Sequence, residues 1–254
     1  SPSLEGEEMG VNLPGFKKGD RTDIELPAVQ RELIDALHRA GKKIILVNCS
    51  GSPIGLEPET QKCEAILQAW YPGQQGGKAV AEVLFGDYNP AGKLPVTFYR
   101  NVSQLPDFED YNMTGRTYRY MQDVPLFPFG YGLSYTTFGY GKTVFDKNEL
   151  TAGQSLKLTV PVTNTGKRNG EEVVQVYLRK QGDAEGPIKT LRAFKRVSIP
   201  AGKTVNVEFD LKDKELEWWD DLSNTVRVCP GNYDIMVGGS SKEEDLQRTT
   251  IAIK

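Results

Sequence analysis

Two hydrophobic periodicities divide this chain near residue 140. Before that point, segments with helical and strand-like patterns alternate. Pro27 opens a predicted helix that places Val29, Leu33, Ile34, Leu37 and Ala40 on one face and stops at Gly41. Residues 76–85 carry a second helical pattern that ends at Gly86. Three short strands are predicted at residues 44–47, 65–70 and 94–98, the first resembling a strand covered on both faces.

From residue 141 onward the pattern changes to a period of two. Apolar residues alternate with polar ones over residues 156–162, 174–178, 205–211 and 233–237. Several short alternating strands over such a length predict an immunoglobulin-like or fibronectin type III-like β-sandwich. Tyr233 is a candidate tyrosine corner. Trp218 and Trp219 point to opposite faces if extended, so that one can fill the core and the other can face the first body.

An aromatic stretch, residues 125–138, separates the two patterns. It holds two prolines, two glycines and five aromatic rings. Pro128, Gly130 and Gly132 exclude an ordinary helix, and rings at this density favour burial over a free linker. The prediction is an α/β-sandwich domain over residues 1–123, an extended connector over 124–140, and an all-β sandwich over 141–254.

Composition narrows the possible functions. A net charge of −3 argues against a nucleic-acid partner, and no apolar run approaches the roughly 20 residues of a membrane span. The cysteines, Cys49, Cys63 and Cys229, are odd in number and fit no zinc pattern, so free thiols are favoured, with a Cys49–Cys63 bridge as the alternative. We expect no metal and no cofactor.

The candidate chemistry lies in the carboxylates. His38 is the single histidine and is expected on a helix surface, which argues against a Ser-His-Asp triad. No phosphate loop or dinucleotide-binding glycine motif is present. Aspartate and glutamate side chains remain, although any one of them is more often a solvated surface charge than a catalytic group.

Several motifs resemble the C-terminal part of a glycoside hydrolase family 3 enzyme, the β-glucosidase and β-xylosidase family. They are Leu-Glu-Gly-Glu-Glu-Met at 4–9, Gly-Asp-Arg at 19–21, Leu-Pro at 26–27, Trp-Tyr-Pro-Gly-Gln at 70–74, Gly-Gly at 76–77, Gly-Asp-Tyr-Asn-Pro-Ala-Gly-Lys-Leu-Pro-Val-Thr-Phe at 86–98, and the aromatic run at 127–138. The resemblance covers essentially the whole chain. It implies an α/β-sandwich, which here lacks its start, followed by a fibronectin type III-like domain.

The resemblance also implies a divided active site. The family's nucleophile lies on an N-terminal barrel domain that this chain does not contain, and the general acid/base of many members is a glutamate in a Glu-Gly element followed by Asp-Arg. The matching residues are Glu5-Gly6 and Asp20-Arg21, and this longer form looks more like the xylosidase-type branch. Glu5 is therefore the expected acid/base, with Glu7 and Glu8 as competing positions.

The leading hypothesis is one half of a retaining, exo-acting β-glycosidase. Its partners would be an oligosaccharide substrate and the absent barrel domain, with no nucleic acid and no membrane. We expect a periplasmic or secreted location in preference to a cytoplasmic one. The alternatives are a non-catalytic carbohydrate-binding or structural module and, less consistent with an α/β body, an adhesion-type fibronectin protein. The sequence leaves open whether the sugar is xylose, glucose or arabinose, and the residues that bind it.

Overall fold

The structure, a computed structural model, describes residues 14–17 and 20–254. It divides into two compact units, each assembled from segments that are separated in sequence. The aromatic connector is shared between them, with the division falling between Phe127 and Pro128. Among the described residues, the first unit takes those up to 85, 97–115 and 123–127, and the second takes 86–96, 116–122 and 128–254.

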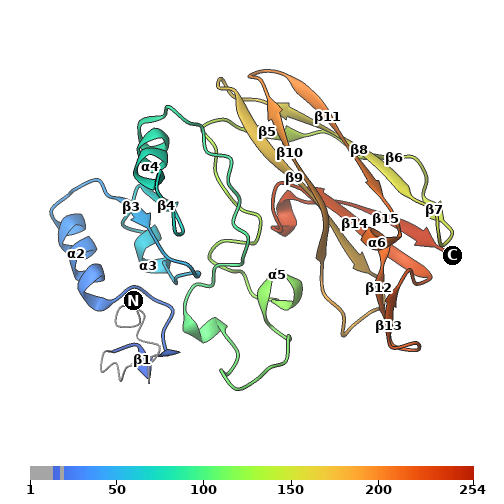
Figure 1. The fold of residues 1–254 in the computed structure, drawn as a ribbon, viewed down its shortest axis with the longest axis horizontal. Coiled ribbons are helices and arrows are strands. Elements are labelled where there is room, and N and C mark those ends of the chain that lie inside the picture. Colours follow the sequence, from blue (N-terminus) through green and yellow to red (C-terminus); the bar gives the residue numbers. More distant parts are fainter. Residues whose placement is uncertain (1–13, 18–19) are drawn as a thin grey trace. The chain divides into compact units, whose positions relative to one another are not determined.

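The first unit alternates short helices and strands (Figure 1). Its elements are β1 (Phe16–Lys17), β2 (Asp20–Arg21), α2 (Ala28–Arg39), β3 (Ile45–Asn48), α3 (Glu57–Thr60), β4 (Ala65–Gln68), α4 (Gly76–Phe85) and the 3-10 helix η1 (Val102–Gln104). β3 and β4 are parallel, with Ile45 opposite Ala65. Parallel strands require a crossover connection, which here contains α3. The predicted helices and the first two predicted strands are confirmed.

Helix α2 follows Pro27 and ends before Gly41, as the sequence predicts. Gly41 has a φ of +67° and donates its backbone N–H to the carbonyl of His38, which is the expected glycine stop. The predicted apolar face is not covered, however. Ile34 is buried, whereas Val29 is 71% and Leu33 61% exposed. On β3, Ile45 is 52% exposed, so the prediction of a strand covered on both faces is wrong for these described residues.

The predicted strand at residues 94–98 does not form. Only an isolated bridge between Phe98 and Phe127 is present there. Pro95 cannot donate a ladder hydrogen bond, and the segment is divided between the two units after Val96. Phe98 is 1% exposed and contacts Trp70 and Phe127 edge-on, at centroid distances of 6.1 and 6.2 Å.

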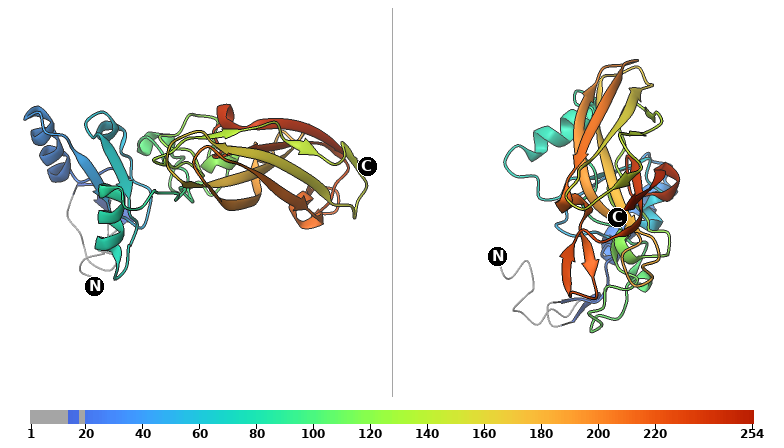
Figure 2. Two further views of the ribbon diagram at one scale, coloured as in Figure 1. Left: turned by 90° about the horizontal axis from the view of Figure 1, so that it is seen from above. Right: turned by 90° about the vertical axis from the view of Figure 1, so that its right-hand side faces the viewer.

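The second unit is a β-sandwich of two antiparallel sheets, apart from one parallel pair (Figures 1 and 2). One sheet has the order β10-β9-β14-β15-β7, and the other has β11-β8-β5 with β6 also pairing β8. The elements are α5 (Thr117–Tyr120), β5 (Phe138–Tyr140), β6 (Val144–Phe145), β7 (Glu149–Leu150), β8 (Leu156–Asn164), β9 (Gly170–Lys180), β10 (Thr190–Ile199), β11 (Thr204–Leu211), α6 (Asp213–Leu216), β12 (Trp218–Asp220), β13 (Thr225–Arg227), β14 (Gly231–Gly238), η2 (Glu243–Asp245) and β15 (Gln247–Ile253).

The sandwich core is the set of inward residues that the alternation predicts. The side chains at alternate positions of β8, from Leu156 to Val162, are at most 1% exposed. Tyr233 is fully buried and its hydroxyl donates to the Cys229 carbonyl at 2.9 Å, the geometry of a tyrosine corner. Trp218 is buried beside Tyr233, at a centroid distance of 6.2 Å, while Trp219 is 49% exposed.

Two smaller expectations, on the cysteines and on His38, are also settled by the structure. The cysteines are free: Cys49 is exposed, Cys63 half-buried and Cys229 buried. His38 lies on the exposed side of α2. Within the described residues, no helix is both long enough and apolar enough to be a membrane span.

Candidate functional site

The predicted acid/base and its two competitors, Glu5, Glu7 and Glu8, lie outside the described residues. The structure does describe the backbone of the other half of the motif, Asp20-Arg21, which forms strand β2. β2 pairs antiparallel with β1, with Phe16 opposite Arg21. Gly15, just before β1, has a φ of +87°, and its carbonyl accepts a 2.8 Å bond from the N–H of Thr22, just after β2.

Arg21 fixes the chain that follows this hairpin. Its Nε donates to the Asp23 carbonyl at 2.9 Å, and its Nη2 donates to the Glu25 carbonyl at 2.6 Å. The guanidinium also lies 5.9 Å from the centroid of the Phe16 ring, within range of a cation–π contact. The Asp23 carboxylate accepts from the Glu25 N–H at 2.9 Å. Arg21 therefore orders the segment that follows the hairpin, up to Glu25.

Glu59 of α3 is a buried carboxylate that is bound by Arg31 of α2. Arg31 Nε and Nη2 donate to the two oxygens of Glu59 at 2.9 and 3.2 Å, and Nη1 binds Glu25. Glu59 is 0% exposed. Burial acts to lower the pKa of Arg31, but the hydrogen bonds to Glu59 and Glu25 outweigh it and raise that pKa. This paired, closed arrangement joins α2 to α3 and has a structural role.

The Asn-Pro-Ala-Gly-Lys motif connects segments of the second unit. Asn89 Nδ2 donates to the Asn169 carbonyl at 2.9 Å. Its Oδ1 accepts from the Ser134 hydroxyl at 2.9 Å and from the Tyr135 N–H at 2.7 Å. One asparagine thus joins its own segment, the connector and a loop of the sandwich.

Lys93 of the same motif reaches a second buried carboxylate. Its Nζ lies 3.2 Å from Glu172 Oε2 and donates to the Gly132 carbonyl at 3.0 Å. The Tyr140 hydroxyl donates to Glu172 Oε1 at 2.8 Å. Burial, followed by the charge of Glu172, raises the pKa of Tyr140, so the hydroxyl keeps its proton. We name Asn89, Lys93, Tyr140 and Glu172 the connector clamp. Nothing in the sequence pattern pairs Lys93 with Glu172, and this arrangement was not predicted.

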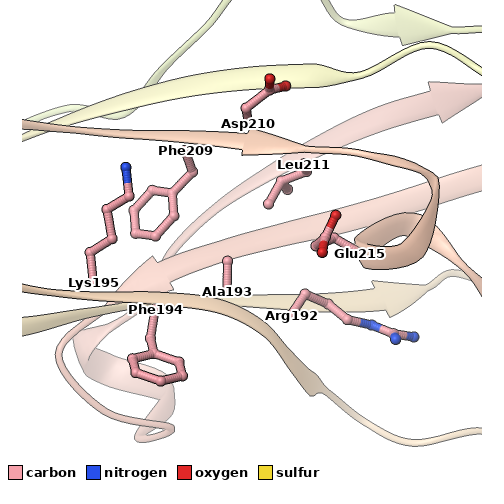
Figure 3. A pocket seen from close by; sticks show the side chains of 8 residues that line it. All are labelled: Arg192, Ala193, Phe194, Lys195, Phe209, Asp210, Leu211 and Glu215. Carbon is pink, nitrogen blue, oxygen red and sulfur yellow. The ribbon is translucent and has the colours of Figure 1, made fainter.

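An open hollow of about 350 Å³ lies between β10 and β11, the edge strands of the two sheets (Figure 3). Phe209 projects from β11 towards β10, while the Phe194 ring lies on the side of β10 away from Phe209. Lys195 Nζ lies 5.3 Å from the centroid of the Phe209 ring and binds the Glu208 carbonyl, so it covers that ring. The Phe209 ring is therefore not free to stack on a ligand in the hollow.

No group of three or more His, Cys, Asp or Glu side chains that could hold a metal ion is found in the part of the chain that the structure describes. The ordered polar clusters are paired internally, and the sequence motifs that characterise the chain hold segments together. What the fold and these sites define is an α/β body and a fibronectin-like β-sandwich in one chain.

The comparison with known families agrees with this architecture. The description "Glycosyl hydrolase family 3 C-terminal domain" matches residues 1–135, and "Fibronectin type III-like domain" matches residues 172–241. The chain belongs to glycosyl hydrolase family 3, and the resemblance stated from its motifs is confirmed.

Its relatives are glycoside hydrolases. A xylan 1,4-β-xylosidase from Xylanibacter ruminicola is 58% identical over 253 residues, which is 100% of this chain and 29% of the relative. A periplasmic β-glucosidase from Salmonella typhimurium is 37% identical over 93% of this chain and 32% of its own length. A solved β-glucosidase structure from Erythrobacter marinus has a TM-score of 0.83 at 40% identity, covering 98% of this chain and 33% of that one. The chain thus spans about a third of each relative and corresponds to a C-terminal part of such an enzyme.

Proposed function

We propose that this chain is the C-terminal portion of a retaining, exo-acting β-glycosidase that releases terminal non-reducing sugars from plant-type oligosaccharides. The observation that carries the proposal is the family membership, joined to the Glu5-Gly6 and Asp20-Arg21 elements in the order that the family motif requires. The 58% identity to a xylan 1,4-β-xylosidase favours a β-xyloside over a β-glucoside as the first substrate to test.

The mechanism divides two carboxyl groups between domains. A retaining glycosidase holds them about 5–5.5 Å apart across the anomeric carbon. In the proposal, the nucleophile on the barrel attacks that carbon to form a glycosyl-enzyme, while the Glu5 carboxyl protonates the departing oxygen. The Glu5 carboxylate then takes a proton from water, which displaces the sugar from the nucleophile.

The Asp-Arg half of the motif is followed by an ordered segment. The bonds from Arg21 to the carbonyls of Asp23 and Glu25 hold the chain just after the Gly-Asp-Arg element. A catalytic group on a loop needs a fixed support, because small displacements of reacting groups cost large factors in rate. Desolvation and a nearby nucleophile would raise the pKa of Glu5 and keep it protonated for the first step.

The decisive experiment uses the full-length protein and three matched variants, Glu5→Ala, Glu7→Ala and Glu8→Ala. Loss of an acid/base slows substrates with poor leaving groups far more than those with activated aryl leaving groups. Added azide replaces the missing base and restores turnover. We expect this pattern for Glu5→Ala alone, with near wild-type kinetics for the other two. The same pattern in Glu7→Ala or Glu8→Ala, with Glu5→Ala unaffected, would show that the assignment is wrong.

The 254-residue chain by itself should be inactive. Loss of one member of a catalytic pair removes most of the rate, and the proposed nucleophile is not on this chain. We expect no measurable release of nitrophenol from nitrophenyl β-xyloside or β-glucoside by the purified chain. Robust turnover would refute the divided site.

We also propose a periplasmic or secreted location for the protein, which the name of the Salmonella relative supports. Cell fractionation of the native producer tests this location.

A further inference from the structure

A two-stranded hairpin of the second unit, β12 and β13, projects from the end of the sandwich (Figures 1 and 2). Trp219 of β12 lies directly opposite Val226 of β13. Directly opposite residues of an antiparallel pair share one face of the ribbon. Trp219 is 49% and Val226 56% exposed, and Leu222 in the turn is 95% exposed. We name the pair Trp219 and Val226, together with the turn residue Leu222, the hairpin face.

The register explains why an indole is presented to solvent. Successive residues of a strand point to opposite faces, and Trp218 occupies the inner one. Trp218 is 3% exposed, lies beside Tyr233, and donates its indole N–H to Asp183 at 2.6 Å. The inner ring thus attaches the hairpin to the sandwich, and Trp219 is directed outward as a consequence.

The outer ring is held in one orientation. The Trp219 Nε1–H donates to Asp221 Oδ1 at 2.9 Å. The turn beneath it is fixed by Asp220 Oδ2, which accepts from the Ser223 hydroxyl and from Arg227 Nε, both at 2.6 Å. A side chain that is already ordered loses less entropy when a ligand binds. The N–H is also satisfied within the hairpin, so the π face of the ring is what remains for a ligand.

The charges around the ring indicate which kind of ligand suits it. Residues 219–226 carry two carboxylates, Asp220 and Asp221, and no basic side chain. Arg227, the basic residue that follows, is bound to Asp220. An anionic ligand would be repelled, whereas sugar hydroxyl groups can donate to carboxylates. Exposed Ser223, Asn224 and Thr225 add neutral polar groups along the same turn.

The size of the hairpin face argues against a protein partner. A stable protein interface buries about 800 Å² on each side and involves some 20–30 residues. Three side chains fall far short of that. A single exposed indole suffices for one pyranose ring, whose C–H face packs on an indole as any apolar surface does on an aromatic ring.

From these observations we infer that the hairpin face, centred on Trp219, is an accessory binding site for a neutral β-linked oligosaccharide. The inference rests on the proposed function for its ligand class, a chain of xylose or glucose units. It adds a second contact with substrate that is separate from the proposed acid/base at Glu5. Linking a weak anchor to a catalytic site raises the effective concentration of substrate without changing the chemistry.

The test titrates the 254-residue chain with xylotetraose and, separately, with cellotetraose by isothermal calorimetry. We expect weak binding of at least one, with a Kd on the order of 0.1–3 mM. Trp219→Ala should weaken it at least about tenfold, and Asp221→Ala, which frees the indole, by a smaller factor. Phe194→Ala is the matched control, because Phe194 is an aromatic side chain of the same unit that is 64% exposed, and it should bind like the wild type.

Two results would overturn the inference. The first is no heat of binding from either tetrasaccharide up to about 10 mM, because weaker binding would make no useful anchor. The second is a Trp219→Ala variant that binds with the same affinity as the wild type. Near-ultraviolet circular dichroism checks that this variant keeps the Trp218 environment. In the full-length enzyme, Trp219→Ala should leave turnover of a nitrophenyl glycoside unchanged. Failure of the anchor is thereby distinguished from failure of the catalytic proposal, which the Glu5 variants test.

Discussion

The buried carboxylate of Glu59 forms an ion pair that bears on the stability of the first unit. Both of its oxygens are bound by Arg31, whose side chain is 23% exposed, so the pair is shielded on one side and open on the other. Such a pair contributes less than its Coulomb attraction suggests, because both ions lose hydration. Removing one partner nevertheless destabilises the fold, because the remaining ion stays poorly solvated.

We therefore expect Glu59→Ala to lower the free energy of unfolding by about 3 kcal/mol, the lower end of the range for breaking a buried pair. Glu32→Ala is the matched control: Glu32 is an exposed carboxylate on the same helix as Arg31, and its loss should cost less than about 0.5 kcal/mol. Urea unfolding followed by hydrogen exchange in α2 and α3 measures both. Equal, small effects would mean that the pair is dispensable.

Asp220 provides a pH-dependent test of the hairpin. Hydrogen bonds from Ser223 and Arg227 lower its pKa from an ordinary value of 3.8 to about 2. A depressed carboxyl pKa stabilises the folded hairpin above pH 3.8, and the stabilisation is lost as the pH falls through about 2. We expect the near-ultraviolet dichroism of the tryptophans to change over that interval. In Asp220→Asn, this change should be absent, and a persisting transition would assign it to another group.

At the scale of elements, the connector is fixed by backbone geometry as well as by the connector clamp. Gly130 has a φ of +78°, and a Cβ at that position would collide with the side chain of Gln175. Gln175 Nε2 donates to the carbonyls of Gly130, at 3.1 Å, and Gly239, at 2.5 Å, while its Oε1 accepts from the Tyr177 hydroxyl at 2.5 Å. This buried glutamine thereby joins the connector to β9 and to the end of β14.

Gly130→Ala should consequently destabilise the second unit by about 3 kcal/mol or more, because it adds a steric clash to an unfavourable backbone conformation. Gly182→Ala isolates the backbone contribution: Gly182 has the same φ of +78°, but a Cβ added there would meet nothing within 4 Å among the described residues beyond its chain neighbours. It should cost only about 1–2 kcal/mol. Thermal unfolding monitored at the sandwich compares the two, and equal losses would show that the clash is relieved by movement of Gln175.

At the scale of the whole molecule, several apolar side chains of the first unit are exposed in the part of the chain that the structure describes. Val29 and Leu33 of α2, and Ile45 of β3, are each more than half exposed. Parallel strands are normally buried on both faces, and the relatives are about three times longer than this chain. We expect another part of the full-length protein to cover this surface.

Leu33→Lys tests this expectation in two contexts. In the 254-residue chain it should change stability by less than about 0.5 kcal/mol, as at any exposed site. In the full-length protein it should destabilise by at least about 2 kcal/mol, since a charge would be buried without a partner. Glu32→Lys, at the neighbouring exposed position, serves as the control in both. A small effect of Leu33→Lys in the full-length protein would show that α2 remains open there.

Much of the fold follows from local pattern. The alternation at Leu156 to Val162 determines which side chains enter the sandwich core, because a strand has a period of two. Pro27 and Gly41 determine where α2 begins and ends. β10 was not predicted, and its register shift between Leu191 and Ala193 explains why: a bulge inserts one residue and breaks the alternation on which the prediction depends.

Only the tertiary structure decides the rest. Lys93 and Glu172 are 79 positions apart, and no local rule pairs them; a buried carboxylate simply requires a partner, and folding brings one. The uncovered face of α2 has the same sequence pattern as a buried face, since periodicity describes amphipathicity and not what lies opposite. Trp218 and Trp219 are chemically identical neighbours, and it is the pairing of β12 with β13 and the packing against Tyr233 that make one a core residue and expose the other to solvent.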